Sequence, residues 1–97
     1  MFETRVARTF DIDGSADRVV LFSWSESTEP RRRNLARVDR HGNVVWRAEL
    51  PGEATHDCFN RLTRDGGGFV AQTFSGWAVR LDANGRVLDS QRTRAFA

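Results

Sequence analysis

Two stretches of the sequence decide the fold, LARVDRHGNVV at residues 35–45 and AVRLDANGRVL at residues 78–88. They align without a gap at a separation of 43 residues. In each stretch, alternating apolar residues lead into an Asp-x-x-Gly tetrapeptide, which is followed by further aliphatic residues. Alternation with a period of two is typical of a half-buried strand, and Asp and Gly favour tight turns. The two stretches therefore predict two equivalent β-hairpins.

A second similarity lies upstream of each hairpin. Residues 19–25, VVLFSWS, resemble residues 69–75, FVAQTFS, at a separation of 50 residues. The difference between the two separations places seven additional residues in the first copy, within residues 26–33. Both segments are apolar on both faces, as strands covered by other layers are. The sequence thus predicts a duplicated unit.

Turn residues divide the chain into eight expected strands. Tight turns are expected at residues 13–14, 39–42, 65–68 and 82–85. The expected strands span residues 3–12, 18–25, 33–39, 43–50, 57–64, 68–74, 77–82 and 86–93. They predict an all-β fold of two four-stranded antiparallel, blade-like sheets in a single domain, 1–97, with its copies at about 3–50 and 57–94. The fifth strand has an alternative, because Ala54, Cys58 and Leu62 are four residues apart and a short helix at 53–62 would bury them equally well.

Alternation also assigns the side chains of each strand to its two faces. In the first strand, Val6 is expected to share a face with Phe10, and in the fourth, Val44 with Trp46. The residues expected to build the core are Val20, Phe22, Trp46, Leu50, Val70, Trp77, Val79 and Leu81.

The length and composition exclude several classes of protein. A chain of 97 residues forms one small domain and is too short for most cofactor-dependent enzymes. Its fifteen basic residues are all arginine and face thirteen carboxylates, so the net charge is only +2 and does not call for a nucleic-acid partner. No apolar run approaches the ~20 residues of a membrane span, and the N-terminus lacks the features of a secretory signal. Cys58 is the only cysteine, which fits a reducing compartment, so we expect a cytoplasmic protein.

Residues 35–47, LARVDRHGNVVWR, resemble a repeat of the pyrroloquinoline quinone-type β-propellers, in which an aspartate, a glycine turn and aliphatic residues precede a tryptophan. The second copy is similar, but Asp89 stands where that tryptophan would be. The resemblance implies two propeller-like blades. It does not extend to the cofactor, because the family's cofactor-binding residues cannot be placed on this chain, and we expect no cofactor.

Two blades cannot close a propeller, and so short a stack leaves an apolar face uncovered. We therefore expect a homo-oligomer, in which copies of the chain complete a ring or pack face to face, or a complex with another protein. The alternative is that the two sheets fold onto each other as a sandwich or small barrel within one chain.

No motif in the sequence predicts a catalytic or metal site. His56 and Cys58 would share a face of a strand, but a thiolate nucleophile also needs a favourable charge and a base within reach, so a packed thiol is the expected role. One cysteine and two histidines cannot complete a tetrahedral metal site. Residues 11–17, DIDGSAD, faintly resemble a calcium loop, but Phe22 occupies the position of its final glutamate.

The residues with the best claim to a binding role are Trp24, Arg31, Arg32 and Arg33, near or within the additional segment. Three guanidinium groups on a loop could bind phosphates, with Trp24 stacking on a base, although a solvated loop neutralised by its own glutamates explains them as well. The three tryptophans could instead stack on a sugar ring. The sequence favours a non-catalytic module that self-associates or binds a protein, with a carbohydrate-binding module and a weak nucleic-acid binder as alternatives.

Overall fold

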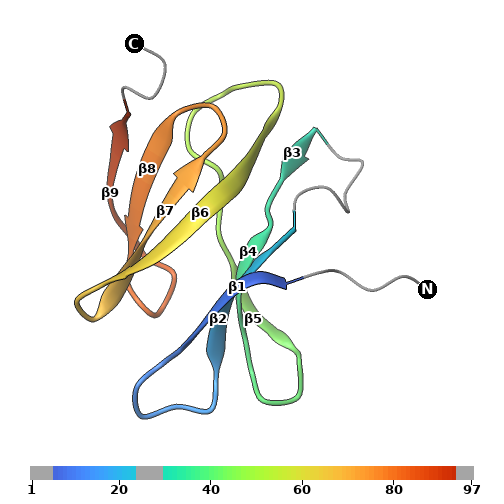
Figure 1. Ribbon diagram of the computed structural model, residues 1–97, viewed down its shortest axis with the longest axis vertical. Coiled ribbons are helices and arrows are strands. Elements are labelled where there is room, and N and C mark those ends of the chain that lie inside the picture. The colour runs from blue at the N-terminus through green and yellow to red at the C-terminus, as the bar shows by residue number, and fades with distance from the viewer. Residues whose placement is uncertain (1–5, 24–29, 94–97) are drawn as a thin grey trace.

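The computed structural model describes residues 6–23 and 30–93, which form nine strands and no helix (Figure 1). The first sheet has the order β1-β2-β4-β5 and is antiparallel throughout. Its strands are β1 (Val6–Asp11), β2 (Arg18–Phe22), β4 (Leu35–Val38) and β5 (Val44–Arg47). The second sheet has the order β3-β6-β7-β8-β9. Its strands are β3 (Arg31–Arg32), β6 (Asp57–Asp65), β7 (Gly68–Thr73), β8 (Trp77–Leu81) and β9 (Val87–Arg92).

The all-β prediction is confirmed, and each of the eight expected strands has a counterpart among the nine. The helix alternative at 53–62 is wrong, because β6 begins at Asp57 and pairs along its length with β7. Sequence reasoning missed β3, a two-residue strand that pairs in parallel with the start of β6. The second sheet therefore has five strands rather than four. Over the described residues the two sheets stay separate and close no barrel.

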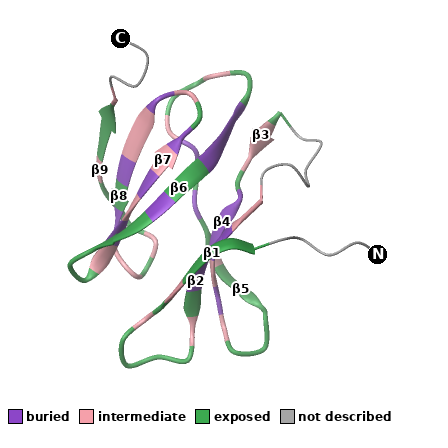
Figure 2. Cartoon of the chain, viewed as in Figure 1, coloured by how far each residue is buried: buried purple, intermediate pink, exposed green. Residues whose placement is uncertain are grey.

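The core lies between the two sheets and draws on both. Its members are Val19, Leu21, Leu35, Ala48 and Leu50 around the first sheet, and Phe59, Leu62, Phe69, Ala71, Val79 and Leu81 in the second. We call the faces that supply these residues the inner faces and the opposite faces the outer faces. Figure 2 shows the burial concentrated in β2, β4, β6, β7 and β8, whereas β1, β5 and β9 at the sheet edges are largely exposed.

The expected core is correct in part. Leu50, Val79 and Leu81 belong to it. Val20 is buried but stands outside the shared cluster. The other expected residues, Phe22, Trp46, Val70 and Trp77, are only half-buried. The largest fully buried side chain, Phe59, was not among the expected residues, because β6 shows no clean alternation in sequence.

β-Bulges correct two of the expected face assignments. A bulge lies between Val6 and Arg8, so Val6 pairs with Phe22 on the outer face while Phe10 pairs with Val19 on the inner face. A second bulge at Arg37 and Val38 pairs Val38 with Val44, and Val44 therefore points away from Trp46. The extra residue in each bulged strand shifts the alternation by one. Strict period two across these strands was the wrong assumption.

The two sheets carry bulges and turns at matching places. The second sheet has bulges between Phe59 and Arg61 and at Arg80 and Leu81. They lie in its first and last antiparallel strand pairs, as the bulges of the first sheet do. Val19 pairs with Arg37 and Val70 pairs with Arg80. With the two hairpins aligned as in the sequence, Val19 thus corresponds to Val70 and not to Phe69, one residue away from the expected alignment.

The turns after β4 and β8 make the same hydrogen bonds. Asp39 Oδ1 accepts the backbone N–H groups of His41 and Asn43 at 2.8 and 2.9 Å. Asp82 Oδ1 accepts those of Asn84 and Arg86, both at 2.9 Å. The amide of Asn43 is the main reason why the pKa of Asp39 lies below its ordinary value. Each turn ends in a glycine of positive φ, 84° at Gly42 and 82° at Gly85.

The second turn is locked to the first sheet. The Trp46 indole lies against Gly85, and its Nε1 donates to the Ala83 carbonyl at 3.0 Å. Arg37 donates to the same carbonyl at 2.8 Å while its Nε pairs with Asp17 at 2.8 Å. No atom lies within 4 Å of a Cβ built at Gly42, so this glycine has no contact like that of Gly85 with Trp46.

Candidate interaction surface

The outer face of the first sheet carries a diagonal stripe of apolar side chains. The strand register places Val6 beside Phe22, Val20 beside Ala36, and Val38 beside Val44. The stripe thus runs from the start of β1, across β2 and β4, to the start of β5. None of its members belongs to the core between the sheets.

The two ends of this stripe are exposed, whereas its centre is buried. Val20, Ala36 and Val38 have relative exposures of 7% or less. At the ends, Val6 is 54% and Val44 49% exposed. Val45, the extra residue of the β5 bulge, adds a further exposed aliphatic side chain next to Val44. A set of exposed aliphatic side chains on one sheet face is typical of a surface that another molecule covers.

The outer face of the second sheet has a different character. Only Val70 and Ala78 are apolar among the residues that the register places there, the others being Arg61, Thr63, Asp65, Gln72, Arg80, Asp89 and Gln91. Arg80 Nε pairs with Asp65 at 3.3 Å on this face. The exposed apolar residues of the second sheet, Phe74, Val87 and Leu88, lie after β7 and on the edge strand β9. This face is therefore suited to solvent.

The inner face of the second sheet carries the residues that correspond to the apolar stripe of the first sheet. By register, Phe59, Ala71, Val79 and Leu81 stand where the first sheet has Val6, Val20, Ala36 and Val38. These residues of the second sheet form the core against the inner face of the first sheet. The same positions of the first sheet receive no cover from the core cluster, although Val20, Ala36 and Val38 are already buried within the chain.

The predicted binding residues are held within the chain where the structure describes them. Arg31 donates to the carbonyls of Ala54, Leu50 and Gly52, which belong to the connection between the sheets. Arg33 donates to the carbonyls of Ala48 and Arg47, and its Nη2 pairs with Glu49 at 2.8 Å. Arg32 is half-buried on β3. Trp24 lies outside the described residues. The arginine run therefore joins the two sheets rather than forming a loop of three extended cations.

Cys58 and His56 form no nucleophile and base pair. Cys58 is buried and His56 exposed. Burial, and then the neighbouring Asp57 carboxylate, raise the pKa of the Cys58 thiol, and Arg32 only partly opposes them. The buried Asp57 carboxylate accepts the amides of Cys58 and Ser75 and the Ser75 hydroxyl, so it organises the turn after β7.

The carboxylates at 11–17 do not gather around a cation site. Asp17 instead forms an ion pair with Arg37. Among the residues at 6–23 and 30–93, no three His, Cys, Asp or Glu side chains are placed to hold a metal ion. The same part of the chain holds no helix long and apolar enough to cross a membrane.

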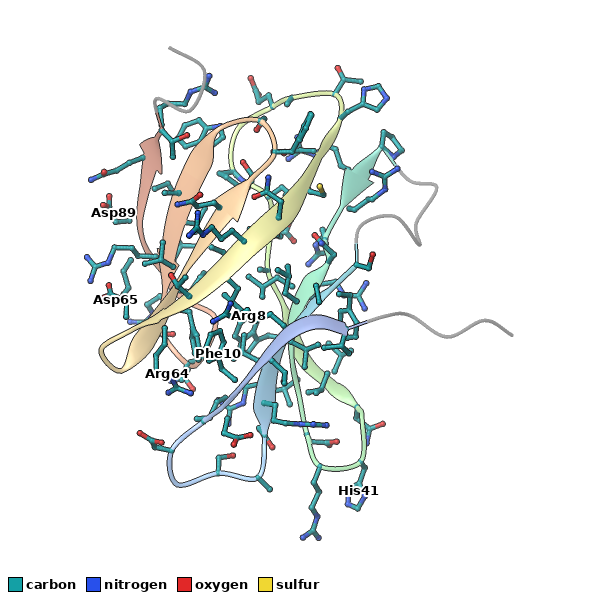
Figure 3. All side chains as sticks on the ribbon, in the orientation of Figure 1. Arg8, Phe10, His41, Arg64, Asp65 and Asp89 are labelled. Carbon is teal, nitrogen blue, oxygen red and sulfur yellow. The ribbon has the colours of Figure 1, made fainter. Side chains whose placement is uncertain are left out.

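Cation–π contacts tie the two sheets together at the β1–β6 contact. Figure 3 shows Arg8, Phe10 and Arg64 grouped there. The Arg8 and Arg64 guanidinium groups lie 5.1 and 5.4 Å from the Phe10 ring centroid, and Arg64 also covers the Phe69 ring. Arg64 donates to the Asp11 carbonyl as well. Sequence reasoning missed this group, because nothing in the sequence places Arg64 beside Phe10.

A family model matches residues 1–92 of the chain. The chain belongs to this family, which is described as Domain of unknown function (DUF7957). No curated protein and no solved structure matches it. The DUF7957 match covers both sheets in full, and of the described residues only Thr93 lies outside it. It carries no activity, substrate or partner, so the function of this DUF7957 chain must be argued from its surfaces.

Proposed function

We propose that the protein is a non-catalytic interaction module that binds another protein, or a second copy of itself, through the outer face of the first sheet. One observation carries the proposal. The apolar stripe on this face occupies the positions that, in the second sheet, form the buried side of the core. A face with this pattern gains stability when a second sheet covers it.

The polar outer face of the second sheet supports a module with a single docking end. Residues there pair with each other, as Arg80 does with Asp65, and Asp89 stands where a counterpart of Trp46 would be. A ring of copies would need this polar face to cover the apolar stripe of the next copy. The proposal therefore favours a partner with an apolar face over a ring of identical blades.

The propeller-like duplication remains part of the proposal. It is supported by the matching bulges, by the matching hydrogen bonds in the turns at Asp39 and Asp82, and by the contact of Trp46 with the second turn. In this interpretation the two sheets are consecutive blades, and the outer face of the first sheet is the side that a preceding blade would cover.

The two alternative functions have less support. Trp46 lies against Gly85 and Trp77 against Gly52. The Arg92 guanidinium also stacks on Trp77, so both half-buried rings already make contacts that a stacked sugar would have to replace. The guanidinium groups of Arg31 and Arg33 donate to backbone carbonyls, and Arg33 also pairs with Glu49, so few of their N–H groups are left to bind phosphates. These contacts favour protein binding over carbohydrate or nucleic-acid binding.

Site-specific photo-crosslinking in cells tests the proposal. A photo-reactive residue replaces Val45 beside the stripe, and a matched one replaces Leu88, which holds the same position in the second hairpin and is similarly exposed, 55% against 53%. We expect crosslinked adducts from position 45 and few or none from position 88. Adducts from position 88 alone, or none from either position, would refute the proposed function.

A further inference from the structure

We propose that Arg8 and Arg64 bind an acidic segment of a partner protein at the edge of the first sheet, where β1 meets β6. We call these two arginines, together with the Phe10 ring that both contact, the arginine site. The site is separate from the apolar stripe, so the inference goes beyond the proposed function and does not depend on it. Three features support it: the guanidinium groups are held in place, the described chain does not neutralise them, and both are exposed.

An aromatic ring holds the two guanidinium groups in place. Figure 3 shows Arg8 and Arg64 beside Phe10, and their guanidinium carbons lie 5.1 and 5.4 Å from its ring centroid. Because both lie over one ring, these carbons are at most about 11 Å apart. Arg64 also covers the Phe69 ring at 5.5 Å and donates to the Asp11 carbonyl. Guanidinium groups that are oriented before binding lose less conformational entropy when they bind a carboxylate.

The charges of the arginine site are not neutralised by the chain itself. Within the described part of the chain, no carboxylate forms an ion pair with either arginine. Both arginines belong to the inner faces, because their cross-strand partners are core residues. The acidic residues nearest to them in sequence, Asp11 and Asp65, alternate onto the outer faces, where Asp65 pairs with Arg80. Two positive charges are therefore available for a partner.

The exposure and the spacing of the two arginines favour an acidic protein segment as the partner. Both side chains are exposed, whereas small molecules are bound mostly in enclosed clefts. In an extended segment, acidic residues two positions apart point the same way and have Cα atoms about 6.6 Å apart, so their two carboxylates can pair with two neighbouring guanidinium groups. The net charge of only +2 gives little attraction for a phosphate backbone.

A titration with synthetic peptides tests the arginine site. The probe is a short peptide in which glutamate alternates with threonine, and the control peptide carries glutamine in place of each glutamate. In NMR spectra of the labelled full chain at low salt, the Nε–H signals of Arg8 and Arg64 should shift with the glutamate peptide at about 1 mM, because two exposed ion pairs bind weakly. The glutamine peptide should leave them in place. Unchanged signals with both peptides overturn the inference.

Substitutions separate the arginine site from a general attraction of charge. Arg8→Gln and Arg64→Gln should each weaken binding of the glutamate peptide by about threefold. Arg61→Gln is the matched control, because Arg61 is also exposed on β6 but belongs to the outer face, and it should have a much smaller effect. Arg64→Lys keeps the charge but loses the planar fork, so it should weaken binding nearly as much as Arg64→Gln. Equal effects of Arg61→Gln and Arg64→Gln overturn the inference.

An oligothymidylate titration tests the other class of partner. Tighter binding of oligothymidylate than of the glutamate peptide, through the same two arginines, assigns the site to a nucleic acid and also overturns the inference. Circular dichroism confirms that each variant is folded, and Arg8→Gln keeps the test valid if the Arg64 variants unfold, because Arg8 contributes only its contact with the Phe10 ring. Crosslinks from position 45 bear on the proposed function alone, since that position lies beside the apolar stripe.

Discussion

Gly85→Ala measures how strongly the two sheets are locked together. A Cβ added at Gly85 would lie 2.7 Å from Trp46 Cδ2 and 2.9 Å from Cγ, far inside contact distance. The indole must therefore leave its place, and its hydrogen bond to the Ala83 carbonyl is lost with it. The positive φ of 82° adds a further cost for any residue with a side chain.

The matched control is Gly42→Ala. Gly42 has nearly the same φ, 84°, in a turn with the same hydrogen bonds, and nothing lies within 4 Å of an added Cβ. Gly42→Ala should therefore lower the free energy of unfolding by about 1 kcal/mol, through the strained backbone conformation alone. Gly85→Ala also loses a hydrogen bond and part of the packing of a half-buried indole, so we expect it to lower the free energy of unfolding by about 3 kcal/mol.

Urea denaturation followed by circular dichroism gives both values. In a Trp46→Ala background the two glycine substitutions should cost the same, because the group that Gly85→Ala displaces is then absent. Equal costs for the two substitutions in the native background would refute the locking of the second turn by Trp46.

Three further predictions concern the buried polar groups. Asn34→Ala should lower the free energy of unfolding by about 2–3 kcal/mol in urea denaturation, because the Asn34 side chain accepts a hydrogen bond from the amide of buried Phe59 and donates one to its carbonyl. A loss below about 0.5 kcal/mol would contradict this role. Asp57→Asn should destabilise the fold by about 1–3 kcal/mol and raise hydrogen exchange at the Ser75 amide first, whereas uniform exchange would argue against a local turn anchor. The Cys58 thiol, whose pKa is raised chiefly by burial, should react with a thiol reagent far more slowly in the native chain than in urea, and equally fast reaction in both states would contradict its burial. Because the raised pKa favours the neutral thiol in the folded state, the free energy of unfolding should fall as the pH rises above the ordinary thiol pKa.

The strands and turns could be predicted from sequence because their causes are local. Asp and Gly at 39–42 and 82–85 favour turns wherever they stand, and the aliphatic residues beside them alternate. The all-β class and the eight expected strands follow from such local patterns along the whole chain. The expected core was correct where alternation was regular, as at Val79 and Leu81.

The wrong face assignments and the missed strand have causes that the alternation of apolar and polar residues does not reveal. A bulge inserts one residue and exchanges the faces beyond it, so Val44 and Val6 were assigned to the wrong side. The adjacent aliphatic pairs Val44-Val45 and Val87-Leu88, each directly after a turn, could have indicated the bulges in both hairpins. β3 leaves no pattern in the sequence, because a strand of two residues is too short to show alternation. It is defined only by its pairing with residues 57–58 of β6, which lie far along the chain.

The candidate surface needed the structure because it depends on register. The sequence indicates that residues 19–24 are apolar on both faces, but not which face the second sheet covers. Arg31 and Arg33 illustrate the same limit, since their partners are carbonyls that lie 14 to 23 residues away in the chain and no sequence motif indicates them.

Solvent accessibility of two matched valines in solution tests the central claim most directly. Val44 and Val87 hold equivalent hairpin positions and are each 49% exposed in the single chain. With a soluble paramagnetic agent added to the labelled chain in a lysate of the cells that produce it, the Val44 methyl signals should broaden much less than those of Val87. Equal broadening of both valines would show the stripe open to solvent and would contradict a covered outer face.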